Sequence, residues 1–176
     1  RSVKALKGAK VLNLFAYTGA DSISAKKAGA DVIHLEGMKQ LVSWARNNME
    51  LNKQGDIRWL IEDALKFVKK EVKRGHKYNG IILNPPSFGV GPNGERFTIE
   101  DNLKQLIYNV GKLLDSRSFV VCNAYNTKVS ALSLHNMFEP HLPNAAKVEL
   151  GELASTFGQN KLLSHGVFFR AGNLLK

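Results

Sequence analysis

Short apolar runs alternate with longer stretches of helical periodicity over most of the chain, and this alternation predicts the order of the elements. A strand is followed by a helix three times in the first half, which is typical of a parallel sheet with crossover helices. Strands are predicted at 10–15, 31–35, 57–61, 79–83, 118–124, 146–151 and 163–170. Helices are predicted at 19–28, 38–52, 62–74, 98–114 and 129–139.

The end of the chain follows a different pattern, because no helix separates the last two predicted strands. Such strands are expected to pair antiparallel at one edge of the sheet. The pattern as a whole predicts an α/β fold: a Rossmann-like, seven-stranded, mostly parallel sheet with helices on both faces and an antiparallel edge strand.

Local signals mark the ends of several predicted elements. Thr18 can cap the helix expected from Gly19, and Gly29 can end that helix in a left-handed conformation. The glycine-rich stretch 89–94 is expected to contain no regular structure and to form a surface loop.

The length of 176 residues predicts a single domain covering 1–176. The chain begins at Arg1 without a methionine, so we expect it to be a piece of a longer protein that lacks an N-terminal region. No apolar run is long enough to span a bilayer, so no membrane partner is predicted. The sequence contains no signal for an oligomeric state.

A single cysteine, Cys122, excludes an internal disulfide and a cysteine-based zinc site. This composition predicts a reducing compartment, which is the cytoplasm, or an organelle matrix in a eukaryote. The five histidines show no metal-ligand spacing, so we predict no metal.

The formal net charge is +10, and the excess of positive charge lies in the first half of the chain. Residues 1–77 contain 16 basic and 8 acidic side chains, against 9 and 7 in the remainder. A basic surface of this kind suits a phosphate-bearing partner such as RNA, but a solvated basic helix explains the charge equally well. The basic residues concentrate in one predicted helix and its end: Lys66, Lys69, Lys70, Lys73, Arg74 and Lys77.

The loop after the first predicted strand, Asn13–Gly19, is built for a close approach of backbone to a ligand. Small residues at Ala16 and Gly19 permit that approach, and the start of the following helix presents free N–H groups. This loop contains neither the Gly-x-Gly-x-x-Gly fingerprint nor a Gly-Lys-Ser/Thr motif. The loop therefore suits a nucleoside ligand without a pyrophosphate, although alone it could be an ordinary turn.

Two carboxylates end the next two predicted strands. Glu36 is placed to accept hydrogen bonds from both hydroxyls of a ribose, or to interact with the dipole of the following helix. Asp63 could accept a bond from an adenine amino group, or cap the helix after it. Because both lie beside the first loop, the nucleoside interpretation is favoured over two separate structural explanations.

The turn Asn84-Pro85-Pro86 follows the fourth predicted strand and is the sharpest local signal. Two prolines fix the backbone and remove two donors, so the Asn84 side chain and nearby carbonyls are held rigidly. These oxygens could accept the two hydrogens of an exocyclic amine and direct its lone pair at a methyl group. Phe88 could stack on a base drawn out of its helix. The alternative is a rigid turn with a packed phenylalanine.

Several motifs resemble those of class I S-adenosylmethionine-dependent methyltransferases, above all the bacterial branch related to large-subunit ribosomal RNA methyltransferases that modify cytosine C5 or guanine. The resemblance covers nearly the whole chain, and its motifs are specific in combination. They are 12–19 (Leu-Asn-Leu-Phe-Ala-Tyr-Thr-Gly), 44–48 (Trp-Ala-Arg-Asn-Asn), 57–59 (Ile-Arg-Trp), 63–67 (Asp-Ala-Leu-Lys-Phe), 130–135 (Ser-Ala-Leu-Ser-Leu-His) and the Pro-Pro-Ser-Phe turn.

This resemblance implies a set of site residues. Phe15, Ala16, Tyr17, Thr18 and Gly19 would contact the methionine part of S-adenosyl-L-methionine. Glu36 would bind the ribose, Met38 the adenine face and Asp63 the adenine amine. Ala64 and Asn84 would complete the cofactor site. The turn of Asn84, Pro85 and Pro86 would face the methyl acceptor, with Ser87 and Phe88 binding it.

The chain departs from that group at two positions. The ribosomal RNA enzymes usually carry Asp where this chain has Asn84, whereas Asn-Pro-Pro resembles enzymes that methylate exocyclic amines. Those enzymes commonly follow it with an aromatic residue rather than Ser87. Cytosine C5 methylation also requires a thiolate. Cys122 is the only candidate, and it lies inside a predicted strand, where a cysteine is usually buried. C5 chemistry is therefore disfavoured.

The sequence thus predicts an S-adenosylmethionine-dependent methyltransferase that acts on a base of ribosomal or other RNA, in rRNA processing. A protein or small-molecule methyltransferase on the same fold is the first alternative. The second is an inactive cofactor-binding module that serves as an RNA-binding or assembly factor, which the departure at Asn84 keeps open. The methylated nucleotide and atom are not fixed by the sequence.

Overall fold

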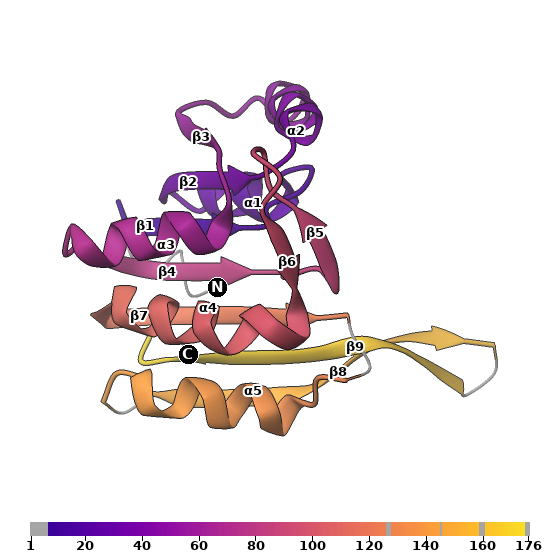
Figure 1. Ribbon diagram of the computed structural model, residues 1–176. Helices are drawn as coiled ribbons and strands as arrows, with labels where there is room; N and C mark the ends of the chain where they lie inside the picture. The colour runs from indigo at the N-terminus through magenta and orange to yellow at the C-terminus, as the bar shows by residue number, and fades with distance from the viewer. Residues whose placement is uncertain (1–6, 126–127, 145, 159–160, 175–176) are drawn as a thin grey trace.

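The structure is a computed structural model and describes residues 7–125, 128–144, 146–158 and 161–174. A seven-stranded sheet in the order β3-β2-β1-β4-β7-β9-β8 forms its centre (Figure 1). The strands of this sheet are β1 (Lys10–Leu14), β2 (Asp31–Glu36), β3 (Ile57–Ile61), β4 (Tyr78–Leu83), β7 (Leu114–Ala124), β8 (Lys147–Phe157) and β9 (Lys161–Gly172). The helices are α1 (Ala20–Lys27), α2 (Lys39–Leu51), α3 (Ala64–Lys73), α4 (Ile99–Leu113), α5 (Ala131–Phe138) and the 3-10 turn η2 (Glu139–His141).

The five strands β3, β2, β1, β4 and β7 are parallel. β9 pairs antiparallel with β7, and β8 pairs antiparallel with β9. The predicted fold class is confirmed, including the antiparallel pairing of the last two strands. The chain runs from β1 outward to β3, then returns to place β4 on the other side of β1. Loops after β1 and β4 therefore leave in opposite directions. A crevice opens between them at the carboxyl ends of the strands.

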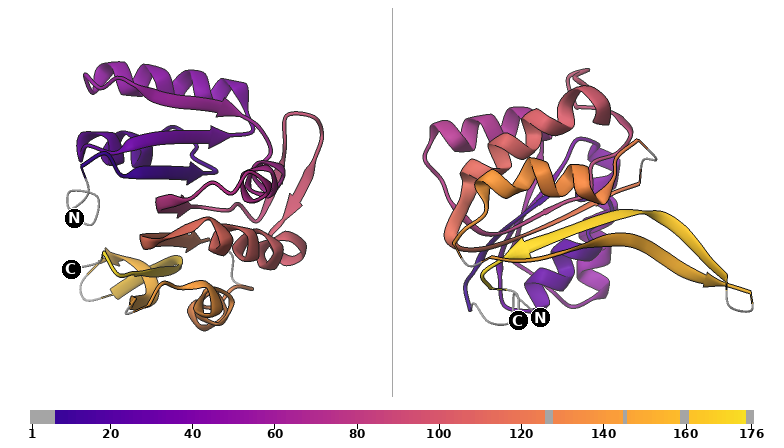
Figure 2. Two further views of the ribbon diagram at one scale, coloured as in Figure 1. Left: turned by 90° about the vertical axis from the view of Figure 1, so that its left-hand side faces the viewer. Right: turned by 90° about the horizontal axis from the view of Figure 1, so that it is seen from below.

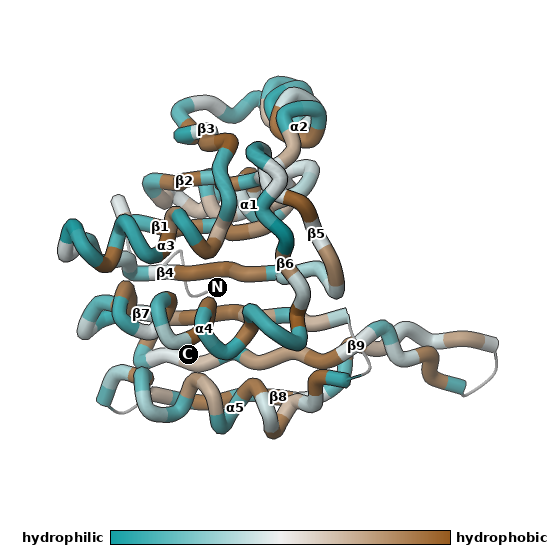
Figure 3. The backbone as a smooth tube through the Cα atoms, viewed as in Figure 1, coloured by the Kyte–Doolittle hydropathy of each residue, from teal (hydrophilic) through white to brown (hydrophobic). Residues whose placement is uncertain are grey.

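Helices cover both faces of the sheet, with α3, α4 and α5 on one face and α1 and α2 on the other (Figure 1). The larger apolar core lies under α3, α4 and α5, and a smaller core lies under α1 and α2. Central strands are buried from both sides, which explains their continuous apolar runs (Figure 3). Among the residues that the structure describes, none of the helices is long and apolar enough to cross a membrane.

The predicted helix ends are partly right. Gly29 has the expected positive φ of 92°. Thr98 caps α4 by accepting a bond from Asp101 N. The prediction for Thr18 is wrong: α1 begins at Ala20, and Gly19, in a left-handed conformation, is the N-cap without a side-chain bond. A left-handed residue immediately before the helix places the Thr18 side chain one position too early for a cap.

The stretch 89–94 is not wholly irregular, as the sequence predicted, because it forms part of a second, two-stranded sheet. β5 (Phe88–Val90) pairs antiparallel with β6 (Arg96–Thr98). Gly91 N donates to Glu95 O at 2.7 Å and closes the turn. On this hairpin Phe97 is buried, with its ring 5.0 Å from that of Phe15. The glycines of this stretch do not indicate a hairpin, and the contact of Phe97 with the loop after β1 stabilises it.

Strands β8 and β9 are longer than predicted, at 11 and 12 residues. Their outer halves project beyond the body of the sheet as a two-stranded arm (Figure 2). The register shifts between Leu153 and Ala154 near the base of this arm. A shift of this kind bends a hairpin, and side chains beyond it are mostly exposed.

Candidate active site

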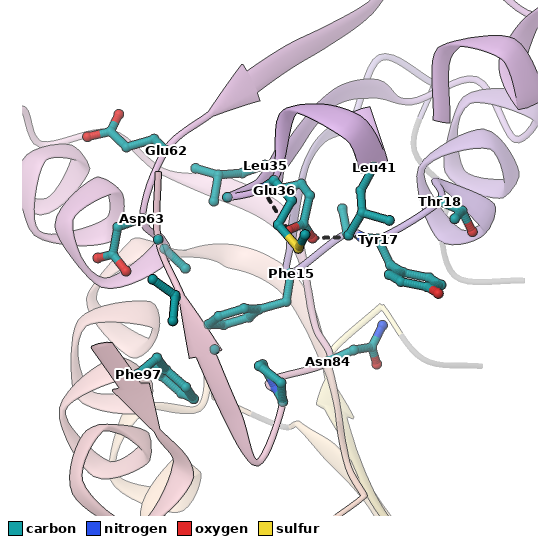
Figure 4. A pocket seen from close by; sticks show the side chains of 18 of the residues that line it. Phe15, Tyr17, Thr18, Leu35, Glu36, Leu41, Glu62, Asp63, Asn84 and Phe97 are labelled. Carbon is teal, nitrogen blue, oxygen red and sulfur yellow. Dashed lines mark hydrogen bonds between the residues drawn. The ribbon is translucent and has the colours of Figure 1, made fainter. Parts of the chain in front are cut away.

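One cavity opens at the carboxyl ends of β1 to β4, where the strand order reverses. Its volume is about 500 Å3, within the range of small-molecule sites. The loops after these strands and the β5–β6 hairpin form its walls (Figure 4). Predicted site residues that line it are Phe15, Ala16, Tyr17, Thr18, Gly19, Glu36, Met38, Asp63, Ala64, Asn84, Pro86 and Phe88. Pro85 is buried and Ser87 is exposed, and neither is among the lining residues.

The loop after β1 has an unusual backbone. Phe15 and Tyr17 have positive φ values of 54° and 49°, which L-residues rarely adopt and which cost on the order of 1–3 kcal/mol each. The turn directs Tyr17 N toward Glu36, whose Oε2 accepts its hydrogen bond at 3.0 Å. Strain in a cavity wall is typical of a functional loop.

Gly19 ends this loop for two physical reasons. Its φ is 87°, and a Cβ at this position would lie 3.0 Å from the Cβ of Ala45 on α2. The loop is also tied to α2 by Asn48 Nδ2, which donates to Thr18 O at 2.9 Å. Two of the motifs that carry the family resemblance, 12–19 and 44–48, are therefore in direct contact. Together they fix the wall formed by the start of α1.

A buried polar network lies beneath the loop. Asn13 Nδ2 donates to Ser22 Oγ at 2.9 Å, and Ser22 Oγ is hydrogen-bonded to His34 Nδ1 at 3.0 Å. Burial lowers the pKa of His34 to about 4, so its imidazole is neutral near pH 7. This network links β1, α1 and β2 directly behind the cavity.

Glu36 and Asp63 lie at the carboxyl ends of adjacent strands, as the sequence predicted. Glu36 accepts from Tyr17 N through Oε2 and from Met38 N through Oε1 at 3.2 Å. Asp63 caps α3, since its Oδ1 accepts from Lys66 N at 2.8 Å. Capping leaves Oδ2 for another donor. The two interpretations of Asp63 are therefore compatible, and its contact with adenine stays a prediction.

Within the described part of the chain, the charged residues that line the cavity are all carboxylates: Asp21, Glu36, Glu62 and Asp63. This lining suits a cation and disfavours a pyrophosphate or triphosphate. S-adenosylmethionine fits this test, because its sulfonium and ammonium groups outweigh its single carboxylate at neutral pH. Apolar side chains, including Phe15 and Leu41, complete the walls (Figure 4).

The β5–β6 hairpin is joined to α3 by an ion pair between Lys66 and Glu95. This bond lowers the pKa of Glu95 to about 2. A Cβ on Gly37 would lie 3.5 Å from the Cα of Gly91, so the tip of the hairpin closely approaches the loop after β2. The hairpin thus forms one side of the cavity.

Asn84 follows β4 and is held by two side chains from distant parts of the sequence. Its Nδ2 donates to Asp21 Oδ2 at 3.0 Å, and its Oδ1 accepts from Asn123 Nδ2 at 2.7 Å. It lies near Tyr17, whereas Asp63 lies on the opposite side of Phe15 (Figure 4). The cavity thus has an Asp63 end and an Asn84 end.

Sequence reasoning missed Asp21, Asn123 and Tyr125. Asp21 and Tyr125 line the cavity, and Asn123 contacts Asn84 from β7. The rule that identified Asn84, a polar residue at the carboxyl end of a parallel strand, also identifies the end of β7. Asp21 carried a weaker signal, as an acidic residue in the first turn of α1.

Cys122 is fully buried on β7, as its pattern predicted, and burial raises the pKa of its thiol well above the usual range. A thiol in this environment does not supply a thiolate near neutral pH. Within the described ranges, no group of three or more His, Cys, Asp or Glu is arranged to hold a metal ion.

The basic residues of α3 are partly neutralised. Lys66 pairs with Glu95, Lys70 with Glu62, and Arg74 with Glu71 at 2.9 Å. Lys77 Nζ donates to the carbonyl oxygen of Lys112 at 2.8 Å. Lys69 and Lys73 have no ion-pair partner among the described residues. The free charge of this helix is therefore smaller than its composition indicated.

Comparison with known proteins places this site in a family. Residues 2–134 match the family model of S-adenosylmethionine-dependent methyltransferases. The crystal structure of the S-adenosylmethionine-dependent methyltransferase from Agrobacterium tumefaciens superposes with a TM-score of 0.90 and is 34% identical, covering 97% of this chain and 58% of that chain. SMU.776, solved in complex with SAH, superposes with a TM-score of 0.77 over 97% of this chain and 46% of that chain. At 20% identity the second likeness shows the fold alone.

Ribosomal RNA large subunit methyltransferase I of Aeromonas hydrophila is 32% identical over 90 residues, which are 49% of this chain and 23% of that protein. The chain spans 30% or less of the length of the first curated relatives it matches. The fold and the position of the cavity are those expected for the family whose model matches residues 2–134. The chain belongs to the family of S-adenosylmethionine-dependent methyltransferases, whose cofactor is S-adenosylmethionine.

Proposed function

We propose that this domain transfers a methyl group from S-adenosylmethionine to a base of RNA, with ribosomal RNA as the first candidate substrate. The observation that carries the proposal is a set of exposed aromatic residues on the cavity lining. Tyr17, Phe88 and Tyr125 are 59%, 60% and 57% exposed. Exposed aromatic rings beside a reacting site suit a planar base that has been drawn out of its stack. The named activity of the Aeromonas relative supports the same substrate class.

The proposed roles divide along the cavity. Glu36 accepts from the ribose hydroxyls, Asp63 Oδ2 from the adenine amine, and Met38 covers the adenine face. Residues Phe15–Gly19 and Ala64 contact the remaining cofactor atoms. Support comes from the carboxylate-only charged lining and from the free acceptor positions on both acids.

At the other end, Asn84, Pro85 and Pro86 are proposed to hold the acceptor for in-line transfer. S-adenosylmethionine supplies a methyl group already activated by its sulfonium, so the protein mainly aligns the reacting atoms. Asn84 would orient the acceptor, and Ser87 and Phe88 would contact its base. Because Cys122 is buried, we propose an exocyclic amine or a ring nitrogen of the base as the acceptor, rather than cytosine C5.

Transfer of radioactive methyl groups to unmodified ribosomal RNA tests the proposal. We expect labelled RNA with the wild type and none with heat-treated enzyme. Labelling of protein or small molecules in place of RNA would support the first alternative. Cofactor binding without any transfer would support an inactive RNA-binding or assembly factor. Calorimetry with S-adenosylhomocysteine and with NAD separates the cofactor assignment from the acceptor, since we expect micromolar binding of the former only.

RNA binding itself is expected to weaken steeply with salt, because neutralised phosphates release counterions. The free lysines Lys69 and Lys73 are the basic residues of α3 to reverse first, followed by Lys70. Reversal to glutamate should weaken binding and flatten its salt dependence, whereas Lys53→Glu serves as an exposed control. Unchanged binding in the α3 variants would make this helix a solvated face. A cytoplasmic location stays a prediction.

A further inference from the structure

A chain of side-chain hydrogen bonds crosses the Asn84 end of the cavity. Asn123 Nδ2 donates to Asn84 Oδ1 at 2.7 Å, and Asn84 Nδ2 donates to Asp21 Oδ2 at 3.0 Å. The three residues come from β7, the end of β4 and the first turn of α1. The fold alone brings them together, since Asp21 and Asn84 are 63 positions apart in the sequence and Asn84 and Asn123 are 39 positions apart.

Asp21 determines which atoms donate and which accept in this series of hydrogen bonds. An ionised carboxylate only accepts hydrogen bonds, so the atom of Asn84 that faces it must be Nδ2. Asn84 Oδ1 then faces Asn123, which must donate. An amide can otherwise turn by half a revolution with little change of shape, and Asn123 could turn with it. Both amide orientations therefore depend on one carboxylate.

The position of Asp21 suits this role. It lies in the first turn of α1, where the positive end of the helix dipole favours a carboxylate. A hydrogen bond with one charged partner is roughly twice as strong as a neutral one. Asp21, Asn84 and Tyr125 line the same cavity, and burial together with the charge of Asp21 raises the pKa of Tyr125.

After its bonds to Asp21 and Asn123, the side chain of Asn84 still has one unused acceptor position and one unused donor position. Its carbonyl oxygen has a second lone pair after accepting from Asn123, and its amide nitrogen has a second N–H after donating to Asp21. If the amide turned over, the unused donor and the unused acceptor would exchange places. An acceptor bound through Asn84 would then meet a donor where it needs an acceptor.

We propose that Asp21 is a positioning residue for the methyl acceptor, because it fixes the amide of Asn84 in one of its two orientations. The inference rests on the proposed function for its effect on transfer, but the amide orientation itself is independent of any activity. Asp21 acts on the acceptor through Asn84, so its loss is expected to leave cofactor affinity unchanged. Asn123 is the second, dependent member of the chain.

The test compares Asp21→Ala, Asp21→Asn and Asp21→Glu with the wild type. Alanine removes the orienting carboxylate, asparagine keeps its size but can also donate, and glutamate keeps the carboxylate. Asp31→Ala is the matched control, because Asp31 is exposed at the amino end of β2, away from the cavity. Three quantities are measured: kcat and KM for methylation of unmodified ribosomal RNA, calorimetric affinity for S-adenosylhomocysteine, and the side-chain amide signals of Asn84 in 15N NMR spectra.

For Asp21→Ala we expect kcat to fall about 10- to 100-fold, since misplacement of a reacting partner by ~1 Å can cost on the order of 100-fold. Cofactor affinity should be unchanged. The single pair of Asn84 amide signals should broaden or split as two orientations become populated. Asp21→Asn should show the same changes in smaller measure, and Asp21→Glu should restore part of kcat.

Two results would overturn the inference. Unchanged Asn84 amide signals in Asp21→Ala would show that the carboxylate does not set the amide orientation. A loss of cofactor affinity parallel to the loss of kcat would place Asp21 in the cofactor site instead. If the wild type methylates no RNA, the proposed function fails, and the NMR comparison still decides whether Asp21 positions Asn84.

Discussion

The two ends of the cavity are held in place by different kinds of partner. At the Asp63 end, Glu36 accepts from the backbone N–H groups of Tyr17 and Met38, and Asp63 accepts from that of Lys66. At the Asn84 end, the amide is held by the side chains of Asp21 and Asn123. One end therefore depends on the path of the backbone, and the other on the identity of particular residues.

This difference bears on how one fold serves many acceptors. Every residue except proline supplies a backbone N–H, so Glu36 and Asp63 keep their partners as long as the loops keep their shape. Side-chain partners change with a single substitution. The Asn84 end can therefore diverge while the Asp63 end is retained. If these ends bind acceptor and cofactor as proposed, this difference fits a fold that hosts many different reactions.

The largest effect is expected for Asn84→Ala, which removes the residue at the centre of the acceptor end. Methyl transfer should fall by on the order of 100- to 1000-fold, the range seen when a hydrogen bond at a reacting centre is lost. Cofactor affinity should stay nearly intact, because the Asp63 end is held separately. Steady-state methylation and calorimetry measure the two quantities.

Asn79→Ala is the matched control for this variant, since Asn79 lies at the other end of the same strand and bonds Arg117 O. We expect it to transfer methyl groups at the wild-type rate. An active Asn84→Ala would remove the Asn-Pro-Pro turn from the reacting centre, and a loss of cofactor binding would show that the two ends are not independent.

The next effect concerns the buried network behind the cofactor loop. His34 has a pKa of about 4 in the folded protein, against 6.5 for an unperturbed histidine, so the unfolded chain takes up a proton first as pH falls. Stability is therefore fully present above about pH 6.5 and declines toward pH 4, by about 3 kcal/mol. Urea unfolding of the wild type across this range measures the loss.

His34→Gln provides the reference, because an amide can bond Ser22 without titrating in this window. The stability difference between wild type and variant should shrink as pH falls, while contributions from the carboxylates cancel. A difference that does not change with pH would contradict a neutral, buried His34.

A smaller effect is expected for Asp63→Ala. Loss of an adenine contact should weaken binding of S-adenosylhomocysteine by on the order of 1–3 kcal/mol. Loss of the cap on α3 should lower stability by about 1 kcal/mol. Asp63→Asn retains a capping oxygen, so it should keep stability while still weakening cofactor binding. If both variants bind the cofactor normally, Asp63 is only a helix cap.

Cys122→Ser is expected to have the smallest effect on the reaction, because the proposed chemistry needs no thiolate. A buried hydroxyl should lower stability by roughly 1–3 kcal/mol, so the rate must be measured well below the melting temperature. Circular dichroism establishes that the variant is folded. A folded but inactive Cys122→Ser would favour C5 methylation and overturn the acceptor chemistry proposed above.

Most regular elements could be predicted from the sequence because their signals are local. Val11, Leu12 and Leu14 are all buried and point to both faces of the sheet, so their pattern identifies a central strand whatever packs on it. Glu36, Asp63 and Asn84 could be found for a related reason. Each ends a predicted parallel strand, and the carboxyl ends of such strands meet at one edge.

The elements that could not be predicted depend on contacts between distant segments. The glycines around the β5–β6 turn indicate irregular backbone, and the hairpin forms where Phe97 packs on Phe15 and Glu95 pairs with Lys66. The left-handed Phe15 and Tyr17 likewise have no sequence signal. Their strain is maintained by surrounding bonds, including that from Tyr17 N to Glu36.

The sequence by itself therefore determined the order of the helices and of the seven strands of the main sheet, the family, and the residues at the ends of four parallel strands. Only the tertiary structure decided how those residues are held. The bonds of Asn84 to Asp21 and Asn123 join residues 63 and 39 positions away, and no periodicity or local propensity encodes such pairs. The physical reason is that hydrophobic pattern acts over a few residues, whereas a hydrogen bond between side chains requires the final packing of the elements that carry them.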